Sequence, residues 1–178
     1  MPVFGIFAIL IKLSSPGPVI FKQERGGRNG KSFILLKFRT MKDAQGSPIT
    51  SSGDERITGI GKFLRKTKLD EMPQFINVLK GDMSVVGPRP EIPEMTRLYT
   101  DRQKEILRFK PGITSLATIK FRNEEEILEY NSPGNSAKFY VREILSDKIE
   151  CDLAYFRKRH FWDDLGIILK TIGAIFYA

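Results

Sequence analysis

Asp70 and Glu71 are adjacent carboxylates in a segment, residues 56–90, that is also rich in lysine and arginine. Pro73 belongs in a first helical turn, so both acids are expected at or just before a helix N-terminus, where the helix dipole and nearby cations would keep them ionised. An ionised carboxylate can attack phosphorus and form an aspartyl phosphate, or it can hold Mg²⁺ through oxygen. Acidic residues also cap many helices, and from this pair alone a plain cap is the better interpretation.

The sequence Gly87-Pro88-Arg89-Pro90 places an arginine between two prolines. Each proline restricts the backbone, so the Arg89 guanidinium has little conformational entropy left to lose on binding. Such an arginine suits bidentate binding of phosphate. A solvated arginine in a surface loop explains the same residues equally well.

Length and composition limit the kinds of protein that this chain can be. Its 178 residues predict a single domain over residues 1–178, and the content of 41% hydrophobic and 28% charged residues excludes intrinsic disorder. The formal net charge of +8 favours an anionic partner: nucleic acid, an anionic lipid surface or a phosphate-bearing substrate. One cysteine, Cys151, and one histidine, His160, exclude an internal disulfide and a multi-histidine metal site.

The elements that must position these residues can be predicted from local patterns. Residues 18–23 and 32–39 are β-branched and aromatic runs on either side of a Gly/Asn-rich turn, which predicts a hairpin with Lys37 near the end of its second strand. Helical spacing begins at Ile60 and continues to Leu79, where Gly81 ends it. Further along, we predict a short strand at 84–86, one long helix at about 93–109 and an acidic helix at 123–129; loops are expected at 40–54 and 131–136.

Both ends of the chain are apolar. Residues 1–11 are uncharged but would reach only about half of a bilayer's apolar thickness of about 30 Å, so we predict either a buried helix or a segment that dips into one leaflet. Residues 161–178 have apolar side chains at helical spacing, with Trp162 and Tyr177 near the two ends. This pattern predicts an amphipathic helix, which either lies in a membrane interface or faces the protein core.

Taken together, these segments resemble the bacterial sugar transferase family, the monotopic polyprenyl-phosphate phosphoglycosyl transferases. The matching stretches cover most of the chain: PGPVIFKQERGGRNGKSFILLKFRTM (16–41), DERITGIGKFLRKTKLDEMPQFINVLKGDMSVVGPRP (54–90), KPGIT (110–114) and DKIECDLAYFRKRHFWDDLGIILKTI (147–172). The long central stretch is highly specific, unlike an isolated DE or GPRP.

The resemblance implies a role for each candidate site residue. Asp70 would be the nucleophile that takes sugar-1-phosphate from a UDP-sugar, releases UMP and leaves a covalent phosphosugar enzyme, from which polyprenyl (undecaprenyl) phosphate collects the group. Glu71 would bind or orient Mg²⁺, so Asp70 and Glu71 form the catalytic pair. Lys37, Arg65 and Arg89 match basic positions that the family uses around the phosphates. Two transfer steps through one enzyme group predict ping-pong kinetics.

The same resemblance implies the fold and the location. We expect an α-rich α+β domain with one β-hairpin and a short additional strand, monotopic on the cytoplasmic face of a bacterial inner membrane and in contact with inner-leaflet lipid. Residues 1–13 would be a shortened membrane-dipping, re-entrant-type helix, and residues 161–178 an interfacial helix. The product would enter lipopolysaccharide, capsule, exopolysaccharide or glycoprotein glycan synthesis. No nucleic acid is expected as a partner, and a homo-oligomer is left open.

Two positions depart from the family pattern. Pro2 stands where the proline of the family's membrane turn falls, so the resemblance implies that this sequence lacks the inbound half of the re-entrant helix. After residues 111–114 the family commonly has Gly-Trp, whereas this chain has Ser115-Leu116.

Three alternatives remain at this stage. The chain could be a catalytically disabled, N-terminally truncated relative. Asp70 could act as a general base that activates the acceptor phosphate in a single displacement. A basic lipid-binding or nucleic-acid-binding protein, with the two acids as a helix cap, is disfavoured by the absence of a recognisable nucleic-acid motif.

Overall fold

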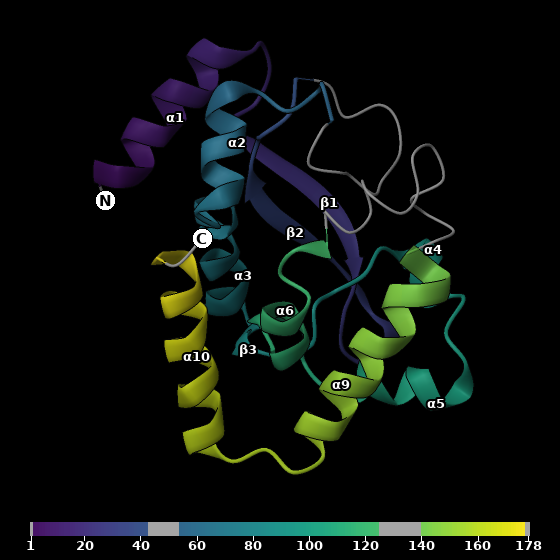
Figure 1. The fold of residues 1–178 in the computed structure, drawn as a ribbon. Helices are drawn as coiled ribbons and strands as arrows, with labels where there is room; N and C mark the ends of the chain where they lie inside the picture. Colours follow the sequence, from purple (N-terminus) through teal and green to yellow (C-terminus); the bar gives the residue numbers. More distant parts are fainter. Residues whose placement is uncertain (1, 43–53, 125–139, 177–178) are drawn as a thin grey trace.

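Helices dominate the fold, and two small sheets lie among them (Figure 1). The computed structural model describes residues 2–42, 54–124 and 140–176. The helices and helical turns are α1 (Pro2–Ser14), η1 (Arg28–Gly30), α2 (Gly59–Lys66), η2 (Leu69–Glu71), α3 (Gln74–Lys80), α4 (Pro93–Thr96), α5 (Asp101–Lys104), η3 (Glu105–Arg108), α6 (Leu116–Lys120), η4 (Tyr140–Leu145), α9 (Ser146–Phe156) and α10 (Phe161–Phe176). The strands are β1 (Ile20–Gly26), β2 (Ser32–Phe38), β3 (Ser84–Val86) and β4 (Gly112–Thr114). The expected α-rich α+β class is confirmed.

The predicted hairpin is present as strands β1 and β2. The strands pair antiparallel, with Ile20 opposite Phe38 and Gly26 opposite Ser32. Asn29 has a left-handed backbone with φ of 56°, a conformation that asparagine tolerates better than most residues. Lys37 is the penultimate residue of β2, as expected, so its side chain leaves the sheet close to the strand's end.

The short strand β3 was predicted, but its partner β4 was not. The two strands pair in parallel, Ser84 with Gly112 and Val86 with Thr114. Just beyond β3 the backbones of Gly87 and Gly112 touch, since a Cβ atom on Gly112 would fall 2.1 Å from the Gly87 nitrogen. Only glycine allows this approach. The contact fixes the start of the loop that carries Arg89.

The prediction of a single long helix at 93–109 is wrong. The segment instead forms α4, α5 and η3 in succession. The break arises at Thr100, whose side chain accepts a hydrogen bond from the Gln103 backbone while the Gln103 side chain accepts one from the Thr100 backbone. This reciprocal capping box starts a new helix in the middle of the apolar pattern. Residues 125–129 of the helix predicted at 123–129, the loop predicted at 131–136 and most of the loop predicted at 40–54 lie outside the described residues.

Two separate clusters of buried side chains form the core. One joins α9, η4, η3, β3 and α10 and contains Ile144, Leu153 and Phe156. The other joins α1, β2 and α2 through Ile11, Phe38 and Leu64, with Leu69 and Met72 packed against it. Because Leu69 precedes the two acids directly, the second cluster anchors the candidate site to the hairpin.

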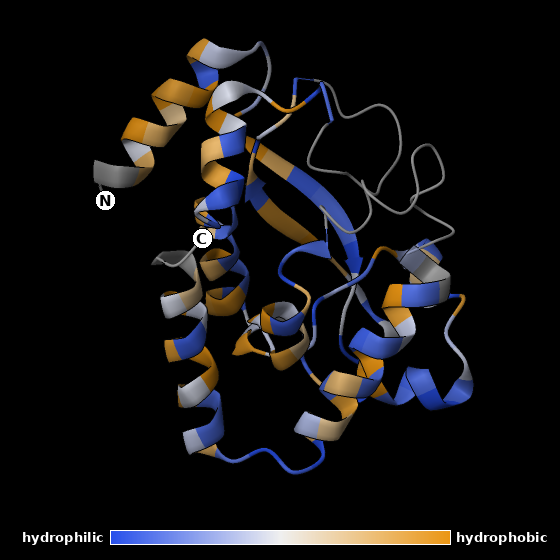
Figure 2. Ribbon diagram, viewed as in Figure 1, coloured by the Kyte–Doolittle hydropathy of each residue, from blue (hydrophilic) through white to orange (hydrophobic). Residues whose placement is uncertain are grey.

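Several helices keep apolar side chains at the surface. Figure 2 shows apolar segments along α1, α3 and α10, which lie on the left of the view. The exposed large apolar residues on these helices and on α2 are Ile6, Ile9, Leu10 and Leu13; Phe63; Phe75, Ile76 and Leu79; and Phe161, Trp162, Leu165, Leu169 and Ile172. On α10 the core contacts come instead from Ile167 and Ile168. Of the apolar face predicted for α10, Ile168 therefore packs against the core, while Leu165, Leu169 and Ile172 are exposed.

Candidate functional site

The two acids lie in the helical turn η2, directly before α3. Lys68, in a left-handed backbone conformation with φ of 55°, turns the chain after α2, and Pro73 caps α3. This confirms the prediction that Asp70 and Glu71 stand just before a helix. Both are buried, at 7% exposure each, so their charges must be stabilised by nearby groups.

Glu71 is held by two cations from distant parts of the chain. Lys37 Nζ lies 3.1 Å from Glu71 Oε1, and an Arg89 guanidinium nitrogen lies 3.1 Å from the same oxygen. Burial alone would raise the pKa of Glu71, but Lys37 and Arg89 outweigh it and hold this pKa well below its usual range. Burial lowers the pKa of Lys37, and the Glu71 charge opposes that shift. Glu71 is thus ionised and fixed in place.

Asp70 has a different environment from its neighbour. Its Oδ1 is buried without a hydrogen-bond partner, and Asp70 forms no ion pair with the part of the chain that the structure describes. Burial raises the pKa of the Asp70 carboxyl above its usual value, and the Glu71 charge adds to this rise; the charges of Lys37, Lys68 and Arg65 oppose the rise without cancelling it. A buried carboxylate oxygen with no partner leaves a position that a proton, a cation or a substrate group can fill.

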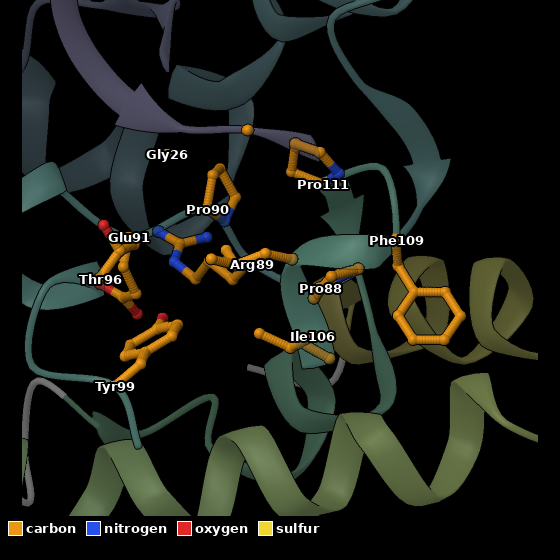
Figure 3. Close-up of a pocket in the computed structure, with 12 residues that line it drawn as sticks. Gly26, Pro88, Arg89, Pro90, Glu91, Thr96, Tyr99, Ile106, Phe109 and Pro111 are labelled. Carbon is orange, nitrogen blue, oxygen red and sulfur yellow. The ribbon is translucent and has the colours of Figure 1, made fainter. Parts of the chain in front are cut away.

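Arg89 is positioned by the loop that follows β3. Figure 3 shows it between Pro88 and Pro90 at the wall of a cavity of about 20 Å³. Arg25, near the end of β1, donates to the Pro90 carbonyl (3.2 Å). Glu71 raises the pKa of Arg89 above its usual value. The cavity has room for about one water molecule, so it is too small for a sugar nucleotide.

The predicted phosphate-binding residues do not all make the same contacts. Lys37 and Arg89 meet on Glu71, as described above. Arg65 instead donates from Nε to Thr40 Oγ1 (3.1 Å) and approaches Met41 Sδ (3.6 Å). Its charge lowers the pKa of Asp70, so it lies within electrostatic range of that carboxylate. The structure therefore brings four of the five predicted residues into one cluster and places Arg65 at its edge.

A second ionic cluster adjoins the Arg89 loop and was not predicted. Tyr140 donates a short hydrogen bond to Glu91, whose carboxylate also lies 3.8 Å from Arg25. Lys148 Nζ contacts the Tyr140 hydroxyl (3.1 Å) and forms an ion pair with Glu124 (2.6 Å). We call these five residues the Glu91 cluster. Its members are far apart in the sequence, and the only local signal was the charged residue that follows Pro90.

The acids can be tested as a site for a divalent cation. Within residues 2–42, 54–124 and 140–176, no three His, Cys, Asp or Glu side chains converge as metal ligands. Mg²⁺ usually binds proteins through one or two carboxylates together with substrate phosphates. The unpartnered Asp70 oxygen and the ionised Glu71 beside it provide two such carboxylates. The residues present fit Mg²⁺.

Comparisons with known proteins show the family of this chain. The family model described as "Bacterial sugar transferase" matches residues 1–178. The chain is 39% identical to a UDP-glucose:undecaprenyl-phosphate glucose-1-phosphate transferase from Escherichia coli (strain K12), with 96% of this chain and 35% of that protein aligned. A protein of the same name from Caulobacter vibrioides is 36% identical over 98% of this chain and 62% of its own length.

A third relative differs in the sugar that its name carries. It is a UDP-N-acetylgalactosamine-undecaprenyl-phosphate N-acetylgalactosaminephosphotransferase from Aeromonas hydrophila, 36% identical over 98% of this chain and 39% of its own length. The chain therefore spans between 35% and 62% of the length of these three relatives. The names share a UDP-sugar and undecaprenyl phosphate and differ in the sugar.

Proposed function

Because the chain belongs to the bacterial sugar transferase family, we propose that it transfers a sugar-1-phosphate from a UDP-sugar to polyprenyl (undecaprenyl) phosphate and releases UMP. The observation that carries this proposal is the contrast between a fixed, ionised Glu71 and an Asp70 oxygen that has no partner. The product, a polyprenyl-diphosphate sugar, would begin the assembly of a surface polysaccharide or a glycoprotein glycan.

Asp70 is the nucleophile in this proposal. One of its carboxylate oxygens attacks the phosphorus that bears the sugar, and the bond from that phosphorus to the bridging oxygen of the diphosphate breaks. UMP leaves with the bonding electrons, and the sugar-1-phosphate stays on Asp70 as an acyl phosphate. An oxygen of polyprenyl phosphate then attacks the same phosphorus and restores the free carboxylate.

The neighbouring cations would bind and orient the diphosphate. The Arg89 guanidinium can donate two parallel hydrogen bonds to phosphate oxygens, and the Lys37 ammonium offers a compact positive charge. Both are held by Glu71 in the absence of substrate, which keeps them in place before binding. Glu71, together with Asp70, would hold Mg²⁺. The ion would neutralise the charge that develops on the leaving UMP.

We also propose that the protein lies on the cytoplasmic face of a bacterial inner membrane. Within the described residues no helix has both the length and the hydropathy to cross a bilayer. The exposed apolar residues of α1, α3 and α10 suit helices that rest in the interface, because their side chains can enter the acyl region while the charged remainder stays in water. Sedimentation with vesicles of bacterial phospholipids tests this location; a protein that stays in the supernatant would contradict it.

The activity can be tested without the lipid acceptor. The protein in detergent, with Mg²⁺ and radiolabelled UDP-sugars, should release UMP in a stoichiometric burst and keep the label on the protein. The Asp70→Asn variant should show neither. UMP release that requires polyprenyl phosphate and leaves the protein unlabelled would favour the single displacement with Asp70 as general base. No release under any of these conditions would contradict the proposed activity and favour a disabled relative.

A further inference from the structure

We infer that Asn77 is a positioning residue of this site. Its side-chain amide sets the register of β2 against α3 and thereby places the Lys37 ammonium on Glu71. The inference rests on the proposed function and deepens it, because it concerns how the same site is assembled. Asn77 does not itself contact either acid in the hydrogen bonds that the structure describes.

The Asn77 amide occupies the edge of β2 that is not paired with β1. Its Oδ1 accepts a hydrogen bond from the Leu36 nitrogen (3.1 Å), and its Nδ2 donates to the Ile34 carbonyl (2.7 Å). These are the backbone groups that a third strand would bond, since alternate residues of a strand direct their N–H and C=O to the same side. The side chain is 1% exposed, so both bonds are shielded from water.

The register matters because Lys37 follows Leu36 directly. Lys37 Nζ reaches Glu71 Oε1 at 3.1 Å, and a slip of one residue along β2 would displace the lysine by about 3.3 Å and turn it to the other face. The apolar cluster of Phe38 and Leu64, with Met72 packed against it, holds β2 against α2 and the segment that leads into α3, but its contacts are not directional. The two amide hydrogen bonds are directional and fix one register.

The backbone of Asn77 connects α3 to the segment that carries the second cation, Arg89. Its carbonyl accepts hydrogen bonds from the nitrogens of Asp82 (3.0 Å) and Met83 (3.2 Å), in the turn that leads from α3 into β3. The loop after β3 carries Arg89. One residue therefore joins both segments whose cations meet on Glu71.

A residue that only stabilised the fold would behave differently. Loss of Asn77 would then lower the melting temperature and leave the rate unchanged wherever the protein is folded. If Asn77 positions Lys37, the rate falls even in fully folded protein, and most of that effect disappears once Lys37 is removed. The two roles are thus separable by rate, by coupling to Lys37 and by geometry.

The experiment compares Asn77→Ala with Ile149→Ala, a control that opens a cavity in the other core cluster. Well below both melting temperatures, the UMP burst should slow by about 30-fold in Asn77→Ala and by less than about twofold in the control. In a Lys37→Met background the added effect of Asn77→Ala should shrink to less than about threefold. Asn77→Asp keeps the side-chain volume but sets an oxygen against the Ile34 carbonyl, and it replaces the alanine variant if that one fails to fold.

Crystal structures of the wild type and of the variant give a readout that does not depend on activity. The distance from Lys37 Nζ to Glu71 Oε1 should lengthen beyond ion-pair range in the Asn77 variant. An unchanged distance, or rate effects of Asn77 and Lys37 that simply multiply, would overturn the inference. If the wild type releases no UMP, the proposed function fails, and the measured distance still decides the role of Asn77.

Discussion

Two clusters of charged side chains lie near Arg89, and their acids are paired differently. In the Glu91 cluster each acid has a cation, Arg25 for Glu91 and Lys148 for Glu124. Around η2, both cations gather on Glu71 and Asp70 keeps a buried oxygen with no partner. An unpaired buried carboxylate costs stability unless a ligand or a proton compensates it. From this difference we expect a ligand at the η2 cluster and a structural role for the Glu91 cluster.

The largest expected effect comes from removing the charge of Glu71 or of Asp70, one at a time. Glu71→Gln leaves Lys37 and Arg89 buried without their acid, so we expect a loss of about 3 kcal/mol in the free energy of unfolding at pH 7. Asp70→Asn removes a charge whose burial already raises its pKa, so stability should not fall. Chemical denaturation of both variants measures these values. Equal losses in the two variants would show that the acids are not differentiated.

A smaller effect is expected in the Glu91 cluster. Tyr140→Phe removes the hydroxyl that donates to Glu91 and accepts from Lys148, so we expect a loss of about 2 kcal/mol in the free energy of unfolding. The UMP burst of folded protein should slow by less than about tenfold, because Arg25 still holds the Arg89 loop through the Pro90 carbonyl. Denaturation and burst kinetics measure the two effects separately. A burst abolished in fully folded Tyr140→Phe would mean that this cluster belongs to the reacting site.

Local patterns predicted the parts of the fold whose signals are local. The hairpin follows from β-branched runs around a Gly/Asn turn, and the place of the two acids follows from Pro73, since a proline fits only the start of a helix. The break at Thr100 was missed because apolar periodicity continues through the capping box and masked it. Strand β4 was missed because three residues carry little propensity, and its pairing depends on a distant glycine contact.

In the candidate site, too, the residues with a local sequence signal were predicted and the contacts between distant residues were not. Asp70, Glu71 and Arg89 were found because each stands beside a proline or another acid within a few residues. Their contacts could not be predicted, since Lys37 reaches Glu71 across 34 positions of the sequence. Asn77 left a weak signal that was overlooked: an asparagine inside an apolar helical pattern has poor helix propensity and needs another reason to be there.

The smallest effect that we predict concerns a third buried acid, Asp152, which can be compared with Asp70 and Glu71. It accepts a hydrogen bond from the Ala117 nitrogen (2.9 Å) and has no cation in ion-pair range among the described residues; burial raises its pKa from 3.8 to about 6. Between these two values the folded state binds the proton more tightly than the unfolded state, so this group makes stability fall as pH rises from about 4 to about 6. Glu71, with its lowered pKa, acts in the opposite sense and loses its contribution as pH falls.

Asp152→Asn should remove this dependence while keeping an oxygen that can accept from Ala117. The unfolding free energy of the variant relative to wild type should therefore rise by about 1 kcal/mol between pH 4 and pH 6, because some relaxation around the ionised carboxylate reduces the full linkage value. Denaturant unfolding of both proteins at a series of pH values gives this difference directly. A difference that stays constant with pH would mean that the pKa of Asp152 is the same in the folded and the unfolded protein, and that burial does not shift it.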